Sequence, residues 1–131
     1  MREKWTIGEV ADRADVPAST IRYYERIALL PEARRVHGRR RYGEAVLPKL
    51  NVIRLAQQAG FTLAEIQTLL HDFPEETRPS IRWEKMAERK LVELDERLRT
   101  IREMKALLER TLQCQCETLE ECAADIDRDC L

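Results

Sequence analysis

The sequence predicts a mainly α-helical protein in which a winged helix-turn-helix domain is followed by one long helix. Three observations support this fold class. Short amphipathic segments with capping residues fill the first half of the chain, and a basic hairpin sequence interrupts them. An unbroken polar stretch with heptad-spaced apolar residues fills much of the second half. The predicted domains are the winged unit over residues 1–75, a coiled-coil helix over 76–112 and a cysteine-rich tail over 113–131.

Charge is unevenly divided along the chain. The formal net charge is −1, but residues 1–60 hold 12 basic and seven acidic residues, whereas residues 61–131 hold 11 and 17. Clustered Lys and Arg raise the affinity of a surface for anions whatever the total charge is. The front half therefore predicts a polyanionic partner, and so short a chain argues against a large catalytic core.

The residue pattern predicts a cytoplasmic protein without membrane contact. No apolar run of signal-peptide or membrane-spanning length follows the charged residues 1–4. All four cysteines lie after residue 113. In a reducing compartment, clustered thiols more often bind metals or sense oxidants than form structural disulfides.

Two short helices are predicted to open the chain. Thr6 is a candidate N-cap, and Glu9 completes a capping box for a helix that ends near Ala14. Pro17 suits the first turn of a second helix that continues from Ser19 to Ile27. Two short helices joined by a tight turn form a helix-turn-helix unit.

The second helix is predicted to have one apolar and one polar face. Ile21 and Tyr24 are expected to pack on the first helix. The opposite face can enter a major groove and carries Arg22, Tyr23 and Arg26. The guanidinium of Arg22 can read guanine or hold a phosphate, and the sequence leaves both options open.

A strongly basic wing is predicted between Arg34 and Tyr42. The segment holds five arginines around a glycine that permits a chain reversal. Guanidinium groups match phosphate oxygens bidentately, so such a wing can hold the DNA backbone beside the groove. A solvated charged turn is the alternative, although five like charges in nine residues repel one another. The hydroxyls of Tyr23 and Tyr42 can donate to phosphate, or both rings can be core aromatics with an exposed edge.

Two further helices are expected before the long one. The third runs from Glu44 to Ala59 and carries Arg54 opposite its apolar stripe, where the guanidinium can reach a phosphate. The fourth begins with a second capping box, formed by Thr62 and Glu65, and ends near Leu70.

The long helix is predicted from Ser80 to Leu112, a stretch without Gly or Pro. Its apolar residues alternate in steps of three and four, and only Lys105 interrupts the seam. The seam consists of Ala87, Leu91, Leu94, Leu98, Ile101, Leu108 and Leu112. A helix of this length reaches about 50 Å, and a narrow seam on a charged rod is best buried against a second copy. We therefore predict a homodimer; the alternative is a helix folded back on its own domain, with Met104 and Leu107 widening the stripe.

In this order, the motifs resemble the mercury-resistance regulator (MerR) family of bacterial transcription factors. The resemblance rests on Ile21-Arg22-Tyr23-Tyr24-Glu25, Arg34, Gly38-Arg39-Arg40-Arg41-Tyr42, Arg54, Ala59-Gly60-Phe61-Thr62-Leu63 and Glu65-Ile66. It implies a DNA-binding regulator, not an enzyme, with a winged domain at each end of an antiparallel coiled-coil dimer. It also implies that an effector distorts promoter DNA so that RNA polymerase can use two recognition elements spaced too far apart.

The resemblance further implies which residues contact DNA. The predicted set, with neighbours on the same elements, is Ser19, Thr20, Arg22, Tyr23, Arg34, Arg40, Arg41, Tyr42 and Arg54. One position departs from the family, because Ala28 stands where a glycine is usual and the loop before the wing is a residue shorter.

The tail is predicted to be a sensor. Cys114, Cys116 and Cys122 lie within nine residues, and thiolates select copper(I), zinc, mercury or iron-sulfur clusters over hard cations. The Cys114-x7-Cys122 spacing resembles the effector loop of the copper(I), silver and gold members. Ser80 falls close to where those members carry serine and the divalent-metal members carry cysteine. Copper(I) is therefore the favoured thiophilic ion, and zinc is an alternative.

Other uses of the thiols stay open. The Cys114-x-Cys116-x5-Cys122 spacing is similar to the last three ligands of the superoxide-responsive iron-sulfur members. Their first ligand would fall at Thr111, so a cluster would need Cys130. Redox sensing by such a cluster or by direct thiol oxidation is the alternative function. A thiol oxidoreductase is disfavoured, because three nearby glutamates and no basic residue surround the thiols.

Overall fold

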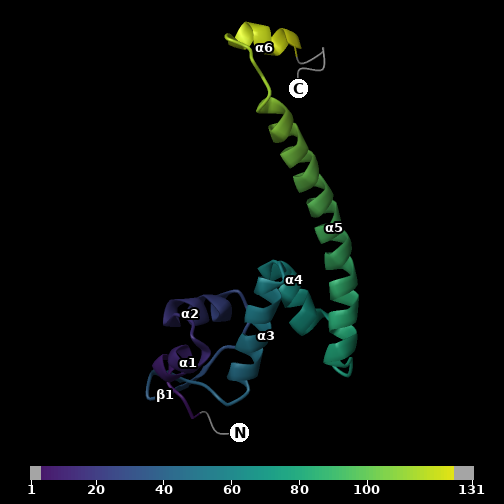
Figure 1. The fold of residues 1–131 in the computed structure, drawn as a ribbon. Coiled ribbons are helices and arrows are strands. Elements are labelled where there is room, and N and C mark those ends of the chain that lie inside the picture. The colour runs from purple at the N-terminus through teal and green to yellow at the C-terminus, as the bar shows by residue number, and fades with distance from the viewer. Residues whose placement is uncertain (1–3, 126–131) are drawn as a thin grey trace. The chain divides into compact units, whose positions relative to one another are not determined.

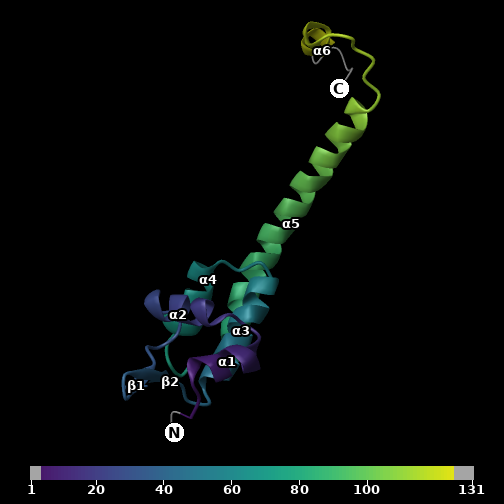
Figure 2. The same ribbon diagram turned by 90° about the vertical axis from the view of Figure 1, so that its left-hand side faces the viewer.

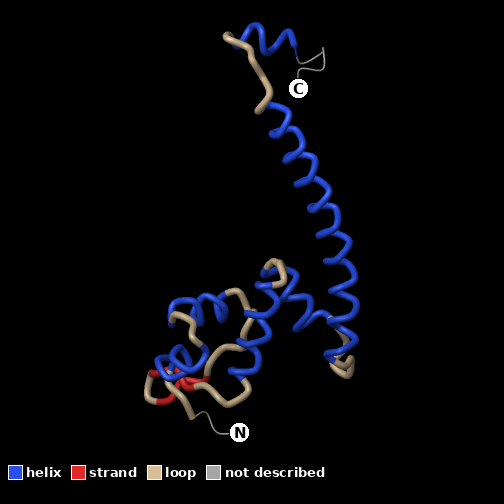
Figure 3. The backbone as a smooth tube through the Cα atoms, in the orientation of Figure 1, coloured by secondary structure: helices blue, strands red, loops and turns tan. Residues whose placement is uncertain are grey.

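The protein is described by a computed structural model that covers residues 4–125. Within these residues, Figure 3 shows mostly helices, with strands only in one hairpin, which confirms the predicted mainly helical fold with a wing and a long helix. The elements are α1 (Ile7–Ala14), α2 (Ala18–Arg26), β1 (Arg34–Val36), β2 (Arg39–Arg41), α3 (Val46–Gln58), α4 (Leu63–Gln67), the π-helix η1 (Thr68–Asp72), α5 (Pro79–Thr111) and α6 (Leu119–Asp125).

The chain divides into two compact units, Met1–Met86 and Ala87–Leu131. The first unit contains the helix-turn-helix, the wing and the start of α5, and the second contains the rest of α5 and α6 (Figure 1). The predicted boundaries at residues 75 and 112 remain predictions. None of the described helices is both long enough and apolar enough to cross a membrane.

The predicted capping box begins α1. The Thr6 hydroxyl accepts a hydrogen bond from the Glu9 amide at 3.2 Å, and the Glu9 carboxylate accepts from the Thr6 amide at 3.3 Å. Helix α2 starts and ends one residue earlier than predicted. Its Ile21 and Tyr24 are buried, as expected for the face that packs on α1. The local signals thus placed both helices correctly.

The wing is a two-stranded antiparallel hairpin (Figure 2). His37 and Gly38 form its turn with positive φ values of 54° and 78°, so the chain reverses at the predicted glycine. The cross-strand pairs are Arg34 with Arg41, Arg35 with Arg40, and Val36 with Arg39. Beyond β2, the Tyr42 amide donates to the Trp5 carbonyl at 2.8 Å, and this bridge ties the N-terminal segment to the wing.

One hydrophobic core holds the first unit together. Its largest fully buried side chains are Val10, Ile21, Leu29, Leu30, Ile53 and Ile66. Burial of each aliphatic side chain stabilises the fold by about 1.5–3 kcal/mol. The Tyr24 hydroxyl donates to Gln57 Oε1 at 3.3 Å and links α2 to α3. The core therefore fixes α2 so that its opposite face is exposed.

The fourth helix is longer than predicted and changes type. It begins with the predicted capping box of Thr62 and Glu65, but after Gln67 it continues as the π-helix η1 to Asp72. The Arg82 guanidinium of α5 lies at the end of η1. It donates to the carbonyls of Leu69, Leu70, Pro74, Glu75 and Thr77 at 3.0–3.3 Å. One side chain thus donates to two carbonyls of the π-helix and to three of the loop that follows it.

Helix α5 runs almost as predicted, and its seam is largely exposed. Leu98, Ile101 and Leu108 are 49%, 52% and 63% exposed. Helix α6 was not predicted. Its signal is a third capping pattern, in which the Thr118 hydroxyl accepts from the Glu121 amide at 3.2 Å.

Ala28 adopts a left-handed backbone conformation after α2. Its φ is 59°, and the Leu29 amide then donates to the Tyr24 carbonyl at 2.9 Å, which closes the helix end. Left-handed backbone costs an L-residue with a Cβ about 1–2 kcal/mol, whereas glycine adopts it freely. This left-handed conformation explains why glycine is usual at this position in the family that the sequence resembles.

We expect Ala28→Gly to increase the free energy of unfolding by about 1 kcal/mol, because glycine relieves the left-handed strain. Urea denaturation followed by circular dichroism measures this difference. The matched control is Ala64→Gly in α4, which is exposed and right-handed and should lose about 0.5–1 kcal/mol. A destabilised Ala28→Gly variant would contradict the strain argument.

Candidate functional site

The exposed face of α2 carries the predicted groove contacts. Arg22 is exposed and Tyr23 is 41% exposed, so Tyr23 is not a core aromatic. The Arg26 guanidinium lies 5.7 Å from the centroid of the Tyr23 ring, within cation–π range. In the first turn of the helix, Ser19 is exposed and Thr20 is half-buried. This face presents hydrogen-bond donors and two positive charges to solvent.

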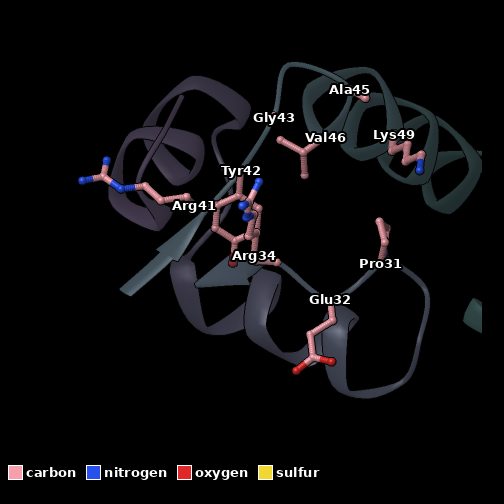
Figure 4. A pocket seen from close by; sticks show the side chains of 10 residues that line it. Pro31, Glu32, Arg34, Arg41, Tyr42, Gly43, Ala45, Val46 and Lys49 are labelled. Carbon is pink, nitrogen blue, oxygen red and sulfur yellow. The ribbon is translucent and has the colours of Figure 1, made fainter. Parts of the chain in front are cut away.

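One side of the wing faces a cavity of about 280 Å³ beside the start of α3. Figure 4 shows the Arg34 side chain next to the Tyr42 ring, whereas Arg41 points away and Lys49 lies across on α3. Arg34 is exposed and Arg41 is half-buried. Arg34 and Lys49 therefore place positive charge beside this cavity, whose lining also includes the carboxylate of Glu32.

Tyr42 and Arg40, both predicted to contact DNA, share the carboxylate of Glu25. The Arg40 Nε donates to Glu25 Oε2 at 3.3 Å, and the Tyr42 hydroxyl donates to Glu25 Oε1. Tyr42 is only 4% exposed, and burial, together with the Glu25 hydrogen bond, raises the pKa of Tyr42 well above its ordinary value. The hydroxyl proton of Tyr42 is thus held by Glu25.

Glu25 is the important residue of this region that the sequence prediction did not assign. Its side chain is only 6% exposed, although it belongs to a helix whose outer face is basic. The sequence offers one signal for it: Glu25 is an acidic residue that ends the otherwise basic and aromatic motif Arg22-Tyr23-Tyr24-Glu25, before the wing. Its two partners come from β2 and from the residue after it, so Glu25 joins α2 to the wing.

Arg54 stands apart from the groups that Glu25 joins. It is exposed on α3, as predicted, and its Nη2 donates to Asn51 Oδ1 at 3.1 Å. An exposed guanidinium that is held by one uncharged partner keeps its charge and most of its donors available.

The structure brings three of the cysteines together. The Sγ atoms of Cys114, Cys116 and Cys122 all lie within 4.8 Å of one another, and all three residues are half-buried. The Cys116 amide donates to the Cys114 sulfur at 3.4 Å. Cys130, the fourth cysteine, lies outside the described residues. A donor set made only of sulfur fits a thiophilic ion.

Helix α6 is the element that closes the thiol cluster. Cys114 and Cys116 lie in the loop after α5, whereas Cys122 lies in the second turn of α6. Thr118 caps α6, and the Glu121 carboxylate accepts from the Glu117 amide at 3.0 Å. These local contacts turn the chain back so that Cys122 meets the other two thiols.

A winged helix-turn-helix with a basic exposed face, joined to a long helix and a thiol cluster, defines a DNA-binding regulator. Two family models match the chain. One, described as MerR HTH family regulatory protein, matches residues 5–72, and the other, described as MerR, DNA binding, matches residues 47–111. The chain belongs to the MerR family and is therefore a transcription regulator and not an enzyme.

Individual relatives agree with this assignment. The chain is 32% identical to the HTH-type transcriptional regulator HmrR of Rhizobium leguminosarum bv. viciae, over 88% of this chain and 95% of the relative. It is 37% identical to the mercuric resistance operon regulatory protein of Pseudomonas fluorescens, over 87% of this chain and 78% of that protein.

A similar solved structure is that of the transcription regulator PbrR691 from Ralstonia metallidurans CH34 in complex with lead(II). The TM-score is 0.71 at 28% identity, and the match covers 88% of this chain and 91% of that one. One relative is thus named for mercuric resistance, and one similar structure was solved with a thiophilic metal.

The Tyr42–Glu25 contact predicts a pH dependence of stability. A tyrosine whose pKa is raised in the folded state stabilises it fully below the unfolded pKa of about 10, and this stability is lost as pH rises further. We expect the unfolding free energy of the wild type to fall more steeply above about pH 10 than that of Tyr42→Phe. Urea denaturation at a series of alkaline pH values tests this. Parallel curves for the two proteins would contradict it.

Proposed function

We propose that the protein is a homodimeric activator that senses a thiophilic metal ion and distorts the DNA of its promoter. The observation that carries the sensory part is the convergence of three thiol sulfurs within 4.8 Å at the end of the long helix. Two similar proteins support this proposal, one named for mercuric resistance and one solved in complex with lead(II), although these metals are stated for those proteins and not for this chain.

In this proposal, α2 enters the major groove and the wing lies along the backbone. The exposed Arg22 and Tyr23 reach base edges or phosphates, with Ser19 and Thr20 at the start of the same helix. Arg34, Arg40 and Arg41 hold phosphates from the wing, and Arg54 does so from α3. Tyr42 acts through Glu25, because its hydroxyl donates to that carboxylate.

The dimer interface in this proposal is the seam of α5. Its exposed side chains are Leu91, Leu98, Ile101, Leu108 and Leu112, and Met104 and Leu107 beside them are also exposed. Such an exposed apolar stripe, interrupted only at Lys105, is unfavourable in water and matches a second copy of the same helix. A dimer along this seam carries two basic domains, as a two-fold symmetric operator requires.

The sensor in this proposal is formed by Cys114, Cys116 and Cys122. A soft cation, with copper(I) favoured, would bind thiolates from both the loop after α5 and α6, and so would connect these two segments. The thiols of the loop and of α6 bind it together, so metal binding and the position of α6 are thermodynamically linked. Zinc is a weaker fit, because structural zinc takes four protein ligands and the described residues supply three.

Activation requires energy for bending the DNA. Distorting a promoter costs about 1–6 kcal/mol, depending on sequence-dependent stiffness. An effector shifts the protein toward the distorting conformation only as far as it binds that conformation more tightly. Because the thiols lie on two different segments, the affinity of the site for metal depends on how these segments are arranged, and it can therefore differ between two conformations.

Redox sensing is the second candidate function. The observation in its favour is the same cluster, because sulfurs within 4.8 Å need only a small shift to form a disulfide. An iron-sulfur cluster with four cysteine ligands would in addition require Cys130. A visible absorption band after anaerobic reconstitution, or activation by an oxidant without metal, would favour this function.

For the DNA-binding part, we expect Arg22→Ala to weaken binding about tenfold or more, since one good base or phosphate contact contributes about 1–3 kcal/mol. Fluorescence anisotropy with a duplex selected from a random pool measures the affinity. The control is Arg89→Ala, an exposed arginine of α5 with the same change of charge. Sedimentation should show dimers for both variants, and equal affinities would count against the proposed role of α2.

For the sensor part, we expect reduced protein to bind copper(I) stoichiometrically, and the double variant Cys114→Ser with Cys122→Ser to lose this binding, because a hydroxyl is a poor ligand for soft ions. Competition titrations with a chromogenic chelator measure it, with silver(I), mercury(II), lead(II) and zinc(II) compared in parallel. Cys130→Ser is the matched control and should retain binding. The metal proposal fails if none of these ions binds the wild type.

A further inference from the structure

Cys116 is the thiol that a two-coordinate copper(I) ion leaves unused. The spacing that favours copper(I) involves only Cys114 and Cys122. The Sγ atom of Cys116 nevertheless lies within 4.8 Å of both of the other sulfurs. The structure therefore offers three converging sulfurs from a single chain, one more than a two-coordinate ion needs.

Local hydrogen bonds hold the three thiols on their two segments. The Cys114 amide donates to the Thr111 carbonyl at 3.1 Å, at the end of α5, and the Cys122 amide donates to the Thr118 carbonyl at 3.1 Å. The Cys116 amide donates to the Cys114 sulfur at 3.4 Å, which links these two residues. The donors thus lie together before any ion binds, and this lowers the ordering cost of binding.

The donor set consists of three sulfurs. Among residues 4–125, no carboxylate or imidazole atom joins the thiols within 4.8 Å of all three. Structural zinc takes four protein ligands, whereas trivalent arsenic and antimony form three bonds to sulfur and direct a lone pair of electrons to the fourth side. Three soft donors without a fourth therefore match a pyramidal, trivalent ion of this class.

Neighbouring charges favour the same class of ion. Glu117, Glu120 and Glu121 are exposed, and residues 113–124 contain no Lys or Arg. Three thiolates leave two negative charges uncompensated on copper(I) and one on a divalent ion, but none on a trivalent ion. Since carboxylates close by make excess negative charge unfavourable, the uncharged complex of a trivalent ion suits this segment best.

We propose that Cys114, Cys116 and Cys122 also form a site for trivalent arsenic or antimony, a second class of ligand for the sensor. The proposal rests on the metal-sensing function proposed above and deepens it. Arsenic(III) reaches the site as uncharged arsenous acid. Three S–H bonds and three As–O bonds break, three As–S bonds form, and the thiol protons leave with the hydroxides as three waters. No oxidation state changes, so binding needs neither oxidant nor reductant.

The first test mixes the full chain, reduced with a phosphine, with arsenite and counts bound arsenic by native mass spectrometry. We expect one arsenic per chain, with the loss of three hydrogens that three As–S bonds require. Competition with a dithiol chelator gives the affinity. We expect Cys116→Ser to bind arsenite about a hundredfold or more weakly, because the third bond of the wild type closes within the same chain.

Copper(I) is the matched comparison for Cys116→Ser, because this variant keeps Cys114 and Cys122. We expect its copper(I) affinity to stay close to that of the wild type, so that only the three-coordinate ion distinguishes the two proteins. Cys130→Ser is the control for the loss of a thiol and should bind both ions as the wild type does. Circular dichroism checks that each variant is folded.

Each contrary result has its own meaning. A wild type that binds copper(I) but not arsenite would refute this site and leave the proposed function intact. Equal arsenite affinities for the wild type and Cys116→Ser, or loss of arsenite binding in Cys130→Ser, would refute the assignment of the three ligands. A wild type that binds neither arsenite nor any of the ions compared above would refute the metal-sensing function itself.

Discussion

The arrangement of the proposed DNA-binding face depends on one buried carboxylate. Burial of an ionised group is unfavourable unless charge and hydrogen bonds compensate it. Glu25 meets this condition with Arg40 on one oxygen and the Tyr42 hydroxyl on the other. Because α2 carries the carboxylate and the wing carries both partners, neither element can move without leaving a buried charge unpaired. A wing of only three residues per strand thereby acquires a fixed position next to α2.

The rest of the first unit keeps that face in place. Tyr24 packs on the inner side of α2 and donates to Gln57 of α3, while Trp5 pairs with Tyr42 and ties down the base of the wing. At the other end, Arg82 binds carbonyls of the π-helix and of the loop that follows it. The start of α5 is therefore attached to the core by hydrogen bonds as well as by apolar packing of Trp83 and Met86.

In the second unit, the apolar seam and the cysteines lie on different segments of the chain. Along α5, the exposed seam is flanked by ion pairs such as Glu93 with Arg97 at 2.7 Å and Glu96 with Arg99 at 2.8 Å. Exposed pairs of this kind contribute little stability, so the apolar residues are the main candidates for the proposed dimer contact. The thiols gather only after α5 ends, where the capping of α6 by Thr118 turns the chain back.

The sequence by itself determined most features that depend on neighbouring residues, although the local capping pattern that begins α6 at Thr118 was missed. Capping boxes at Thr6 and Thr62, the glycine of the wing and the heptads of α5 are encoded within a few positions, so element types and most boundaries were predictable. Features that depend on distant residues were decided only by the tertiary structure. Nothing local indicates that Glu25 meets Arg40 and Tyr42, or that the fourth helix ends as a π-helix held by Arg82. The physical reason is that burial and long-range hydrogen bonds select these states, and both arise only when the chain has folded.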